Sequence, residues 1–275
     1  NSTEAVARWG TGTSVAMLII ALFAPILGVL GDFQHWKKRL FTGFVILGVL
    51  ACAAMAPVPF LQVDANAEAL GLALLILYIL STVGFAGANL YYDSFLPEVT
   101  TNERMDRVSS WGYAMGYIGG STIPFIISIA VMLLMNQSVL SYKIAIMIVV
   151  VWWAVFSIPF LKNVKQQYSV EDAPQALAKE AFRNAWKTFK DILKDKKILF
   201  FIIAYFFYID GVDTIISMAT NYGETLGLGA IGMILALLIT QIVAVPFSIL
   251  FGNLAKKVGA MRMIAIAVCV YFVIT

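Results

Sequence analysis

The sequence predicts an all-α integral membrane protein. Hydrophobic residues make up 61% of its 275 positions, and the mean hydropathy of +0.87 is too high for a water-soluble domain. Apolar runs of about 20 residues, the length that crosses a hydrocarbon core of ~30 Å, recur between short polar segments. A membrane β-barrel would show shorter segments of alternating polarity. A bundle of transmembrane helices is therefore expected.

Eight helical spans are expected along the chain. Seven lie near residues 12–31, 40–61, 70–93, 109–135, 139–161, 198–219 and 227–251. The eighth begins near residue 263 and makes only about half a crossing before Thr275. Because the chain also opens at Asn1 rather than at a methionine, we expect the sequence to be a fragment of a longer protein.

Basic residues gather in every second loop. These loops contain Lys37, Lys38 and Arg39, then Arg104 and Arg107, then the basic residues of segment 162–197, and finally Lys256, Lys257 and Arg262. The positive-inside rule places such loops in the cytoplasm, which puts residues 1–11 on the outer side. The net charge of +3 is explained by this topology, so no nucleic-acid partner is expected.

The long basic segment divides the chain. Within it, Leu177, Ala181, Ala185, Phe189 and Ile192 recur at helical spacing, as in an amphipathic helix on the membrane surface. We expect residues 1–161 to form an N-terminal helical bundle and residues 162–197 a cytoplasmic linker. Residues 198–275 would then begin a C-terminal bundle.

Two loops repeat a pattern. GVLGDFQHWKKRL (Gly28–Leu40) follows the first span, and GNLAKKVGAMR (Gly252–Arg262) follows the seventh. Each begins G-x-L at a helix end and turns through a short basic loop. An internal repeat of this kind is typical of membrane transporters.

Both loops resemble the G-x-L-a-D-r-x-G-r-r-x signature of the major facilitator superfamily. In the first copy Gly28, Leu30 and Asp32 fit, whereas Phe33, His35 and Trp36 replace a basic residue, a glycine and a basic residue. In the second copy Gly252, Leu254, Ala255, Gly259 and Arg262 fit, whereas Lys256 replaces the acid. The resemblance implies a two-bundle transporter fold in which the chain supplies helices two to nine of about twelve.

Three further stretches resemble one branch of that superfamily. They are NLYYDSFLPEV (Asn89–Val99), MDRVSSWGYAMGYIGG (Met105–Gly120) and YIDGVDTIISMATNYGETLGL (Tyr208–Leu228). Together they resemble the vacuole effluxers, the autophagy-related group whose fungal members export amino acids from the vacuole. The resemblance implies a secondary transporter for a small polar solute. It would lie in the inner membrane of a bacterium or in a vacuole-type membrane of a fungus.

The superfamily resemblance also implies a cytoplasmic gate. The residues assigned to it are Gly28, Asp32, Lys37, Lys38, Arg39, Gly252 and Arg262. Asp32 would act as a latch by capping a helix N-terminus in one conformation only. A solvated loop acid paired with Lys37 or Lys38 is the alternative for Asp32.

Two carboxylates interrupt the apolar span FFYIDGVDTII (Phe206–Ile216). Asp210 is twelve residues beyond Ile198, so at ~1.5 Å per residue it lies about 18 Å into a ~30 Å core. Asp213 shares its helix face, and Gly211 between them permits local unwinding. We interpret Asp213 as the proton carrier and Asp210 as the substrate contact. A purely structural role, in which both bond to neighbouring helices or cap a break at Gly211, stays open.

A second polar group lies on the third span. Asn89 and Asp93 are four residues apart and therefore share a helix face, with Tyr92 beside them. By analogy with the superfamily, this face lines the central cavity and contacts substrate. The alternative is that Asp93 pairs with Arg104, Arg107 or the Lys37 cluster.

A glycine series marks the fourth span. Gly112, Gly116, Gly119 and Gly120 have the spacing at which helices pack closely. The same segment partly matches the antiporter motif of the superfamily, without its proline. Both interpretations stay open, and close helix packing is favoured.

Enzyme chemistry finds no support in the sequence. There is one histidine, no H-E-x-x-H motif, and two cysteines inside apolar spans, so no catalytic site, metal site or cofactor is expected. The two loop copies favour a carrier that rocks between two bundles. A channel-like pore and a non-transporting membrane scaffold remain alternatives. The expected partners are a small solute, the lipid bilayer and, if the acids titrate, protons.

Overall fold

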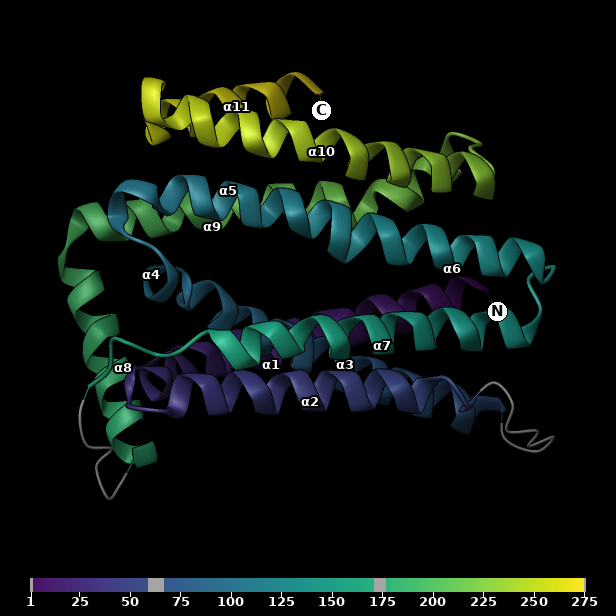
Figure 1. The fold of residues 1–275 in the computed structure, drawn as a ribbon, viewed down its shortest axis with the longest axis horizontal. Helices are drawn as coiled ribbons and strands as arrows, with labels where there is room; N and C mark the ends of the chain where they lie inside the picture. Colours follow the sequence, from purple (N-terminus) through teal and green to yellow (C-terminus); the bar gives the residue numbers. More distant parts are fainter. Residues whose placement is uncertain (1, 59–66, 171–176, 275) are drawn as a thin grey trace. The chain divides into compact units, whose positions relative to one another are not determined.

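The computed structural model describes residues 2–58, 67–170 and 177–274, and they form helices (Figure 1). Within these residues the one β-type pairing is an isolated parallel bridge between Phe33 and Val170. Seven of the described helical segments are long and apolar enough to cross a membrane, and the apolar stretch Met261–Val273 is shorter. The predicted all-α membrane fold is confirmed.

The chain divides into two compact units, which are described separately. One unit contains residues 1–101 and 123–185, and the other contains residues 102–122 and 186–275. This division groups residues by their contacts. The bundle boundaries expected at residues 161 and 198 remain a prediction.

The first unit contains the helices of the first three spans, the last part of the fourth and the fifth. Its helices are α1 (Ser2–Asp32), α2 (Trp36–Met55), α3 (Ala67–Ser94), α4 (Leu96–Val99), α6 (Ile123–Leu134) and α7 (Val139–Asn163). Helix α2 lies alongside α1, α3 and α7 (Figure 1). It begins at Trp36, earlier than the predicted residue 40. The basic residues expected in the loop form its first turn, where Lys37 is buried against an acid described below.

Helices α2 and α3 approach each other at glycines. A β-carbon at Gly84 would lie 2.5 Å from the Gly48 α-carbon and 2.8 Å from the Phe44 carbonyl oxygen. One at Gly87 would overlap the Phe44 ring. The Ser81 hydroxyl donates to the Gly48 carbonyl oxygen across the same crossing, at 3.2 Å. Small residues therefore set the separation of these two helices, as is usual where helices pack in a membrane.

The second unit contains a 3₁₀ turn (Asn102–Arg104), α5 (Met105–Met115), a π-helical segment (Gly116–Thr122), α9 (Lys196–Thr225), α10 (Ala230–Val258) and α11 (Ala260–Ile274). Helix α10 packs along α5 and the π-helical segment. Gly252 is buried there, and a β-carbon on it would overlap the Ser110 side chain. Helix α9 runs through Gly211 without the local unwinding that this glycine permits.

The glycine series of the fourth span does not form, within the described part of the chain, the close helix packing that was the favoured interpretation of its spacing. No described atom lies within 4 Å of a β-carbon placed on Gly112, Gly116, Gly119 or Gly120, so these glycines do not mark a close helix approach among the described residues. Three of them lie in the π-helical segment Gly116–Thr122 instead. There the Thr122 hydroxyl donates to the Tyr117 carbonyl oxygen at 2.6 Å.

Helix α8 (Leu177–Lys194) occupies the segment in which a surface helix was expected. Ala181 is fully buried, whereas Phe182, Trp186, Phe189 and Leu193 are exposed. This spacing of three or four residues places the exposed apolar side chains on one face. Trp186 stacks on Phe189 with ring centroids 5.7 Å apart. Helix α8 thus has one exposed apolar face.

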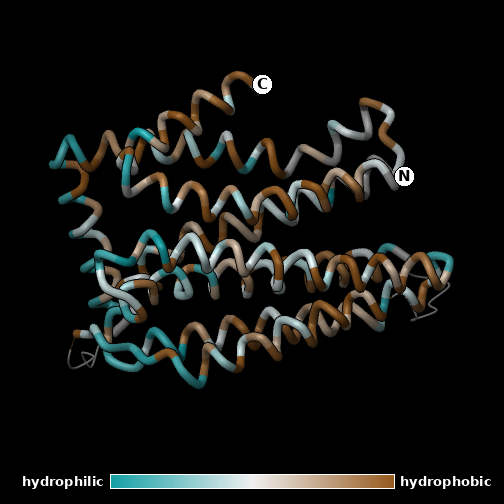
Figure 2. Tube along the Cα trace, turned by 45° about the horizontal axis from the view of Figure 1, so that its top comes forward, coloured by the Kyte–Doolittle hydropathy of each residue, from teal (hydrophilic) through white to brown (hydrophobic). Residues whose placement is uncertain are grey.

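Hydrophobic and hydrophilic residues occupy different parts of each span. Hydrophobic residues predominate along the spans, and hydrophilic residues gather at their ends and in α8 (Figure 2). Large apolar side chains such as Leu22, Phe200 and Phe207 are more than 60% exposed within the apolar spans. Such surfaces are stable in hydrocarbon rather than in water.

Substitution Gly84→Ala tests the glycine crossing. The added methyl group would meet the backbone of α2, which cannot rotate away, so we expect a loss of about 1–3 kcal/mol in stability. Gly71→Ala in the same helix is the matched control, because a β-carbon there meets no described atom within 4 Å. Unfolding of the full-length protein in detergent provides the measurement. Equal stability of the two variants would contradict the predicted close approach.

Candidate functional site

The first loop copy is held in a hydrogen-bonded cluster at one end of the first unit. We define the loop cluster as residues 31–38, residues 96–99 and residues 164–170. Gln34 N donates to the Val170 carbonyl oxygen at 3.2 Å, and Val170 N donates to the Asp32 carbonyl oxygen at 2.8 Å. Gln166 Nε2 donates to the carbonyl oxygens of Gly31 and Phe33 at 3.0 and 3.1 Å. These hydrogen bonds hold the segment after α7 against the turn between α1 and α2.

A buried ion pair lies at the centre of the loop cluster. Lys37 Nζ is 2.8 Å from Glu98 Oε1, and the two side chains are only 11% and 1% exposed. Glu98 Oε2 accepts hydrogen bonds from Gln167 N at 2.6 Å and Tyr168 N at 3.0 Å. Gln167 Nε2 returns a bond to the Glu98 carbonyl oxygen at 2.8 Å. Both carboxylate oxygens are satisfied, which is the condition under which a buried charge can be tolerated.

These contacts set the charge of Glu98. Burial alone would raise the pKa of its carboxyl group, but the hydrogen bonds from Lys37, Gln167 and Tyr168 and the attraction of the Lys37 charge together outweigh burial. The pKa therefore lies below its usual value of 4.5. Glu98 is an anion at neutral pH and serves as the acceptor that joins α4, α2 and the segment after α7.

An aromatic cluster lies next to this ion pair. Phe160 of α7 packs against Phe41 and Phe95 at ring-centroid distances of 4.7 and 5.2 Å. Lys37 Nζ lies 5.4 Å from the centre of the Phe95 ring, within cation–π range. The Tyr91 hydroxyl donates to the Leu27 carbonyl oxygen at 2.7 Å and ties α3 to α1. The ion pair is therefore shielded on its membrane side by packed rings.

The backbone explains an irregular residue of the first loop copy. His35 has φ 68° and ψ −8°, a left-handed conformation that glycine adopts without strain. The superfamily signature has a glycine at this position. In the second copy the matching residue is Gly259, whose φ is also positive at 94°. The two loops thus share a positive φ at the matched position, although ψ differs, being 139° at Gly259.

The remaining gate residues have different local environments. Gly28, Asp32 and Arg39 in the first unit are exposed, and so is Arg262 in the second. Lys38 Nζ donates to the Val164 carbonyl oxygen at 2.8 Å. Lys37 binds Glu98 and Lys38 binds Val164, while Asp32 is exposed and also interacts with the Lys37 charge, so both interpretations of Asp32 stay open. The role of these residues as a gate remains a prediction.

The polar face of the third span is exposed in the first unit. Asn89, Tyr92 and Asp93 all lie on the surface of α3, and the Tyr92 ring contacts Phe160 at a centroid distance of 5.3 Å. Lys37, which was a candidate partner for Asp93, binds Glu98 instead. This exposure leaves the face accessible to a ligand within the first unit. A substrate contact there is still a prediction.

The two acids of the sixth span are also exposed. Asp210 and Asp213 lie three residues apart on α9, hence on one side of this helix, in the second unit. No described group of three or more His, Cys, Asp or Glu side chains is arranged to hold a metal ion. The assignment of Asp210 and Asp213 as a substrate contact and a proton carrier remains a prediction.

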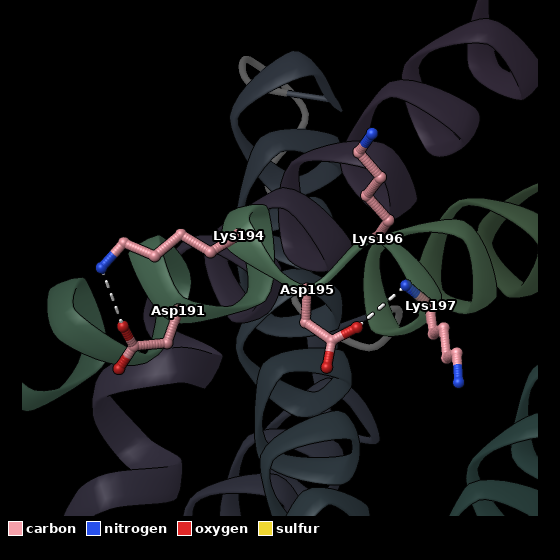
Figure 3. Close-up of a pocket in the computed structure, with 5 residues that line it drawn as sticks. All are labelled: Asp191, Lys194, Asp195, Lys196 and Lys197. Carbon is pink, nitrogen blue, oxygen red and sulfur yellow. Dashed lines mark hydrogen bonds and ion pairs between the residues drawn. The ribbon is translucent and has the colours of Figure 1, made fainter.

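A polar corner joins α8 to α9 (Figure 3). Asp195 Oδ1 accepts from Lys197 N at 2.9 Å and from Ile198 N at 3.3 Å, which caps the N-terminus of α9. Lys194 lies 3.4 Å from Asp191 one turn away. All these side chains are exposed, and both charge signs are present. The corner is accounted for by helix capping and solvation.

Sequence reasoning missed the acceptor at the centre of the loop cluster. Glu98 lies in the quoted stretch NLYYDSFLPEV, but Asp93 was considered there as the partner of the basic cluster. Two of its three donors, Gln167 N and Tyr168 N, are backbone groups that carry no residue-specific signal. The available signal was an acid directly after Pro97, just beyond the end of an apolar span.

The fold and the loop cluster define a multi-pass helical membrane protein of the major-facilitator type. A family model described as "Vacuole effluxer Atg22 like" matches residues 10–275, and the chain belongs to this family. The MFS-type transporter YxiO of Bacillus subtilis is 38% identical over 280 residues, which cover 100% of this chain and 63% of that protein. Comparison with solved structures gives no significant match.

Fungal relatives match over shorter regions. Autophagy-related protein 22 of Yarrowia lipolytica is 28% identical over 138 residues, covering 43% of this chain and 23% of that protein. Its counterpart in Cryptococcus neoformans is 26% identical over 181 residues, covering 63% and 32%. The chain thus spans less than two thirds of the length of each of these relatives.

Substitution Glu98→Gln tests the ion pair. It leaves the Lys37 charge buried without its anion, so we expect a loss of about 3 kcal/mol in the free energy of unfolding at pH 7. Because the folded-state pKa of Glu98 is lowered, its contribution is present above the usual value of 4.5 and is lost as pH falls through the folded-state value. The difference between wild type and variant should therefore shrink below that pH.

The control for this measurement is Glu180→Gln on α8. Glu180 pairs with the exposed Arg183 at 2.6 Å, a contact worth roughly 0–1 kcal/mol. Denaturant unfolding of the full-length protein over a pH series gives both values. A Glu98 variant as stable as the Glu180 variant, or a difference independent of pH, would refute the role given to this ion pair.

Substitutions at His35 test its left-handed backbone. Valine is β-branched and strained at positive φ, so His35→Val should cost about 1 kcal/mol relative to wild type. His35→Asn also removes the imidazole ring but tolerates this conformation, and His35→Gly releases the strain at some cost in chain entropy. Both should stay close to wild type in thermal unfolding. If valine and asparagine were equally stable, the backbone explanation would fail.

Proposed function

We propose that the chain is part of a secondary active transporter that moves a small polar solute by alternating access. The observation that carries this proposal is the family match over residues 10–275, since the family description names an effluxer. The repeated loop supports it, because its two copies share G-x-L and a positive φ at His35 and Gly259. Repeated elements of this kind accompany carriers in which two halves move about a central site.

The solute class that we favour is amino acids. The vacuole-effluxer resemblance implies it, and the exposed acids of α9 are suited to an ammonium group. Asp210 of the second unit is proposed to contact the amine. Asn89, Tyr92 and Asp93 of α3, in the first unit, are proposed independently as contacts for a polar solute. Each of these side chains is exposed within its own unit.

Proton coupling is proposed for Asp213. A carboxylate is costly to retain in a membrane span without a function, and Asp210 lies three residues away on the same side of α9. Asp32 is proposed to favour one conformation of the gate, because its carboxylate is exposed within the loop cluster.

Transport by the full-length protein in liposomes tests this function. Uptake of labelled amino acids should saturate and show counterflow, which a channel-like pore would not. Asp210→Asn should raise KM about tenfold or more, because a hydrogen bond to a charged group is lost. Asp213→Asn should retain counterflow but lose acceleration by an imposed pH gradient. Asp191→Asn on α8 is the control, since Asp191 forms only an exposed pair with Lys194.

Two outcomes would count against the assignments. If both variants kept wild-type rates and wild-type pH dependence, the acids would be structural. If the wild-type protein moved no amino acid but showed counterflow of another solute, the carrier would stand and the solute class would be wrong.

A further inference from the structure

A groove lies on the outer surface of the loop cluster, within the first unit. It has a volume of about 680 Å³ and runs between the first three turns of α2 and the segment after α7. At its polar end are His35, Lys38, Arg39 and Lys165. At its other end are Gly43 and Ile46. Neither the proposed gate nor the proposed transport site accounts for a hollow in this position.

The polar end of the groove is positively charged without compensation from its own lining. No acidic side chain is among the residues that line it. The loop cluster contains two acids outside this lining: Glu98 has both oxygens occupied by Lys37, Gln167 and Tyr168, and Asp32 is exposed and interacts with the Lys37 charge. Three cations that converge without an acid repel each other, and an anion between them removes that repulsion. The groove therefore has the electrostatics of an anion site.

The position of the cations is set by the backbone. The Lys38 ammonium is fixed by its bond to the Val164 carbonyl oxygen, which brings the start of α2 to the segment after α7. No side chain caps the first turn of α2, so the positive end of this helix also faces the polar end. Arg39 and Lys165 are exposed and can reach the same ligand from the two walls.

The opposite end of the groove is apolar and open. Ile46 is 52% exposed, and a β-carbon on Gly43 would meet no described atom within 4 Å. From His35 to Ile46 the helix rises about 16 Å at ~1.5 Å per residue, roughly half of a hydrocarbon core. Since α2 is one of the apolar spans, this end lies at the depth of acyl chains. A small soluble anion would leave it unfilled.

We propose that this groove binds an anionic phospholipid. The phosphate lies among Lys38, Arg39 and Lys165, and one acyl chain lies over Gly43 along Ile46. Basic pockets at the cytoplasmic ends of membrane helices have this chemistry. The site is on the surface of α2 in the first unit, and its occupancy does not depend on the transport proposal.

Native mass spectrometry of the full-length protein in neutral detergent tests the site. Dioleoylphosphatidylglycerol should bind at least tenfold more tightly than dioleoylphosphatidylcholine, which has the same chains and no net charge. Glycerol phosphate, which has the phosphate without chains, should bind at least tenfold more weakly than the anionic lipid. Equal binding of the two lipids would overturn the proposal, and tight binding of glycerol phosphate would identify a soluble anion site instead.

Variants locate the binding on the groove. The double substitution Arg39→Gln with Lys165→Gln should weaken phosphatidylglycerol binding about tenfold or more, whereas Lys179→Gln with Lys187→Gln removes the same charge from exposed positions of α8 and should not. Gly43→Leu fills the apolar end and should weaken binding similarly. Gly71→Leu on α3 is its control, because a β-carbon there also has open space.

The alternative outcomes are distinct. If the α8 double variant weakened binding as much as the groove double variant, general surface charge would explain the affinity and the site would be rejected. If Gly43→Leu left binding unchanged, no acyl chain would lie in the groove. Thermal unfolding of each variant verifies that it is folded, and Gly43→Ala provides a smaller change if the leucine variant is unstable.

Discussion

The buried pair of Lys37 and Glu98 is the interaction on which the basic end of the first unit depends. Two charges withdrawn from water cost several kcal/mol each unless every polar atom finds a partner. Glu98 meets this requirement with one ammonium and two backbone N–H groups drawn from segments far apart in sequence. The start of α2, the short helix α4 and the segment after α7 must therefore order together. The left-handed turn at His35 and the aromatic cluster around Phe160 are arranged around the same pair.

Glu98 differs in its environment from Asp210 and Asp213. Glu98 is enclosed and saturated with donors, so it stabilises a fixed arrangement and has little capacity left for a ligand. Asp210 and Asp213 are exposed on an apolar helix that runs unbroken past them. Retaining charged groups in such a helix is costly without a function or a partner. This contrast is the physical basis for assigning structure to the first acid and chemistry to the other two.

The sequence was sufficient for the features that depend on hydrophobic length. Every expected span overlaps a helix of the structure, because crossing a ~30 Å core requires an apolar run that is visible in one dimension. It was insufficient where partners come from distant segments. Glu98 and Lys37 are 61 positions apart, and the Glu98 donors Gln167 N and Tyr168 N are backbone groups. Helix α2 begins earlier in the structure than the sequence predicts for the same reason. Lys37 in its first turn is buried because it pairs with the distant residue Glu98.

The glycines also show that spacing along the sequence does not identify which residues contact another helix. The series from Gly112 to Gly120 has the spacing of a packing motif but meets no close neighbour among the described residues, whereas Gly84 and Gly87, three residues apart, set a helix crossing. Spacing along one helix identifies a face, and only the partner helix decides whether that face is used. The residue opposite Gly84 is Gly48, more than thirty positions away.

The two matched turn positions carry different evolutionary constraints. At residue 35 the angles fall in the left-handed region, which asparagine, aspartate and histidine also enter, so this position is free to acquire side chains that take on local roles. At residue 259 the combination of φ 94° and ψ 139° is close to a region populated essentially by glycine alone. The two matched turns therefore differ in the substitutions that their backbones tolerate. The first can accept several side chains at its turn, whereas the second is restricted by its backbone to glycine.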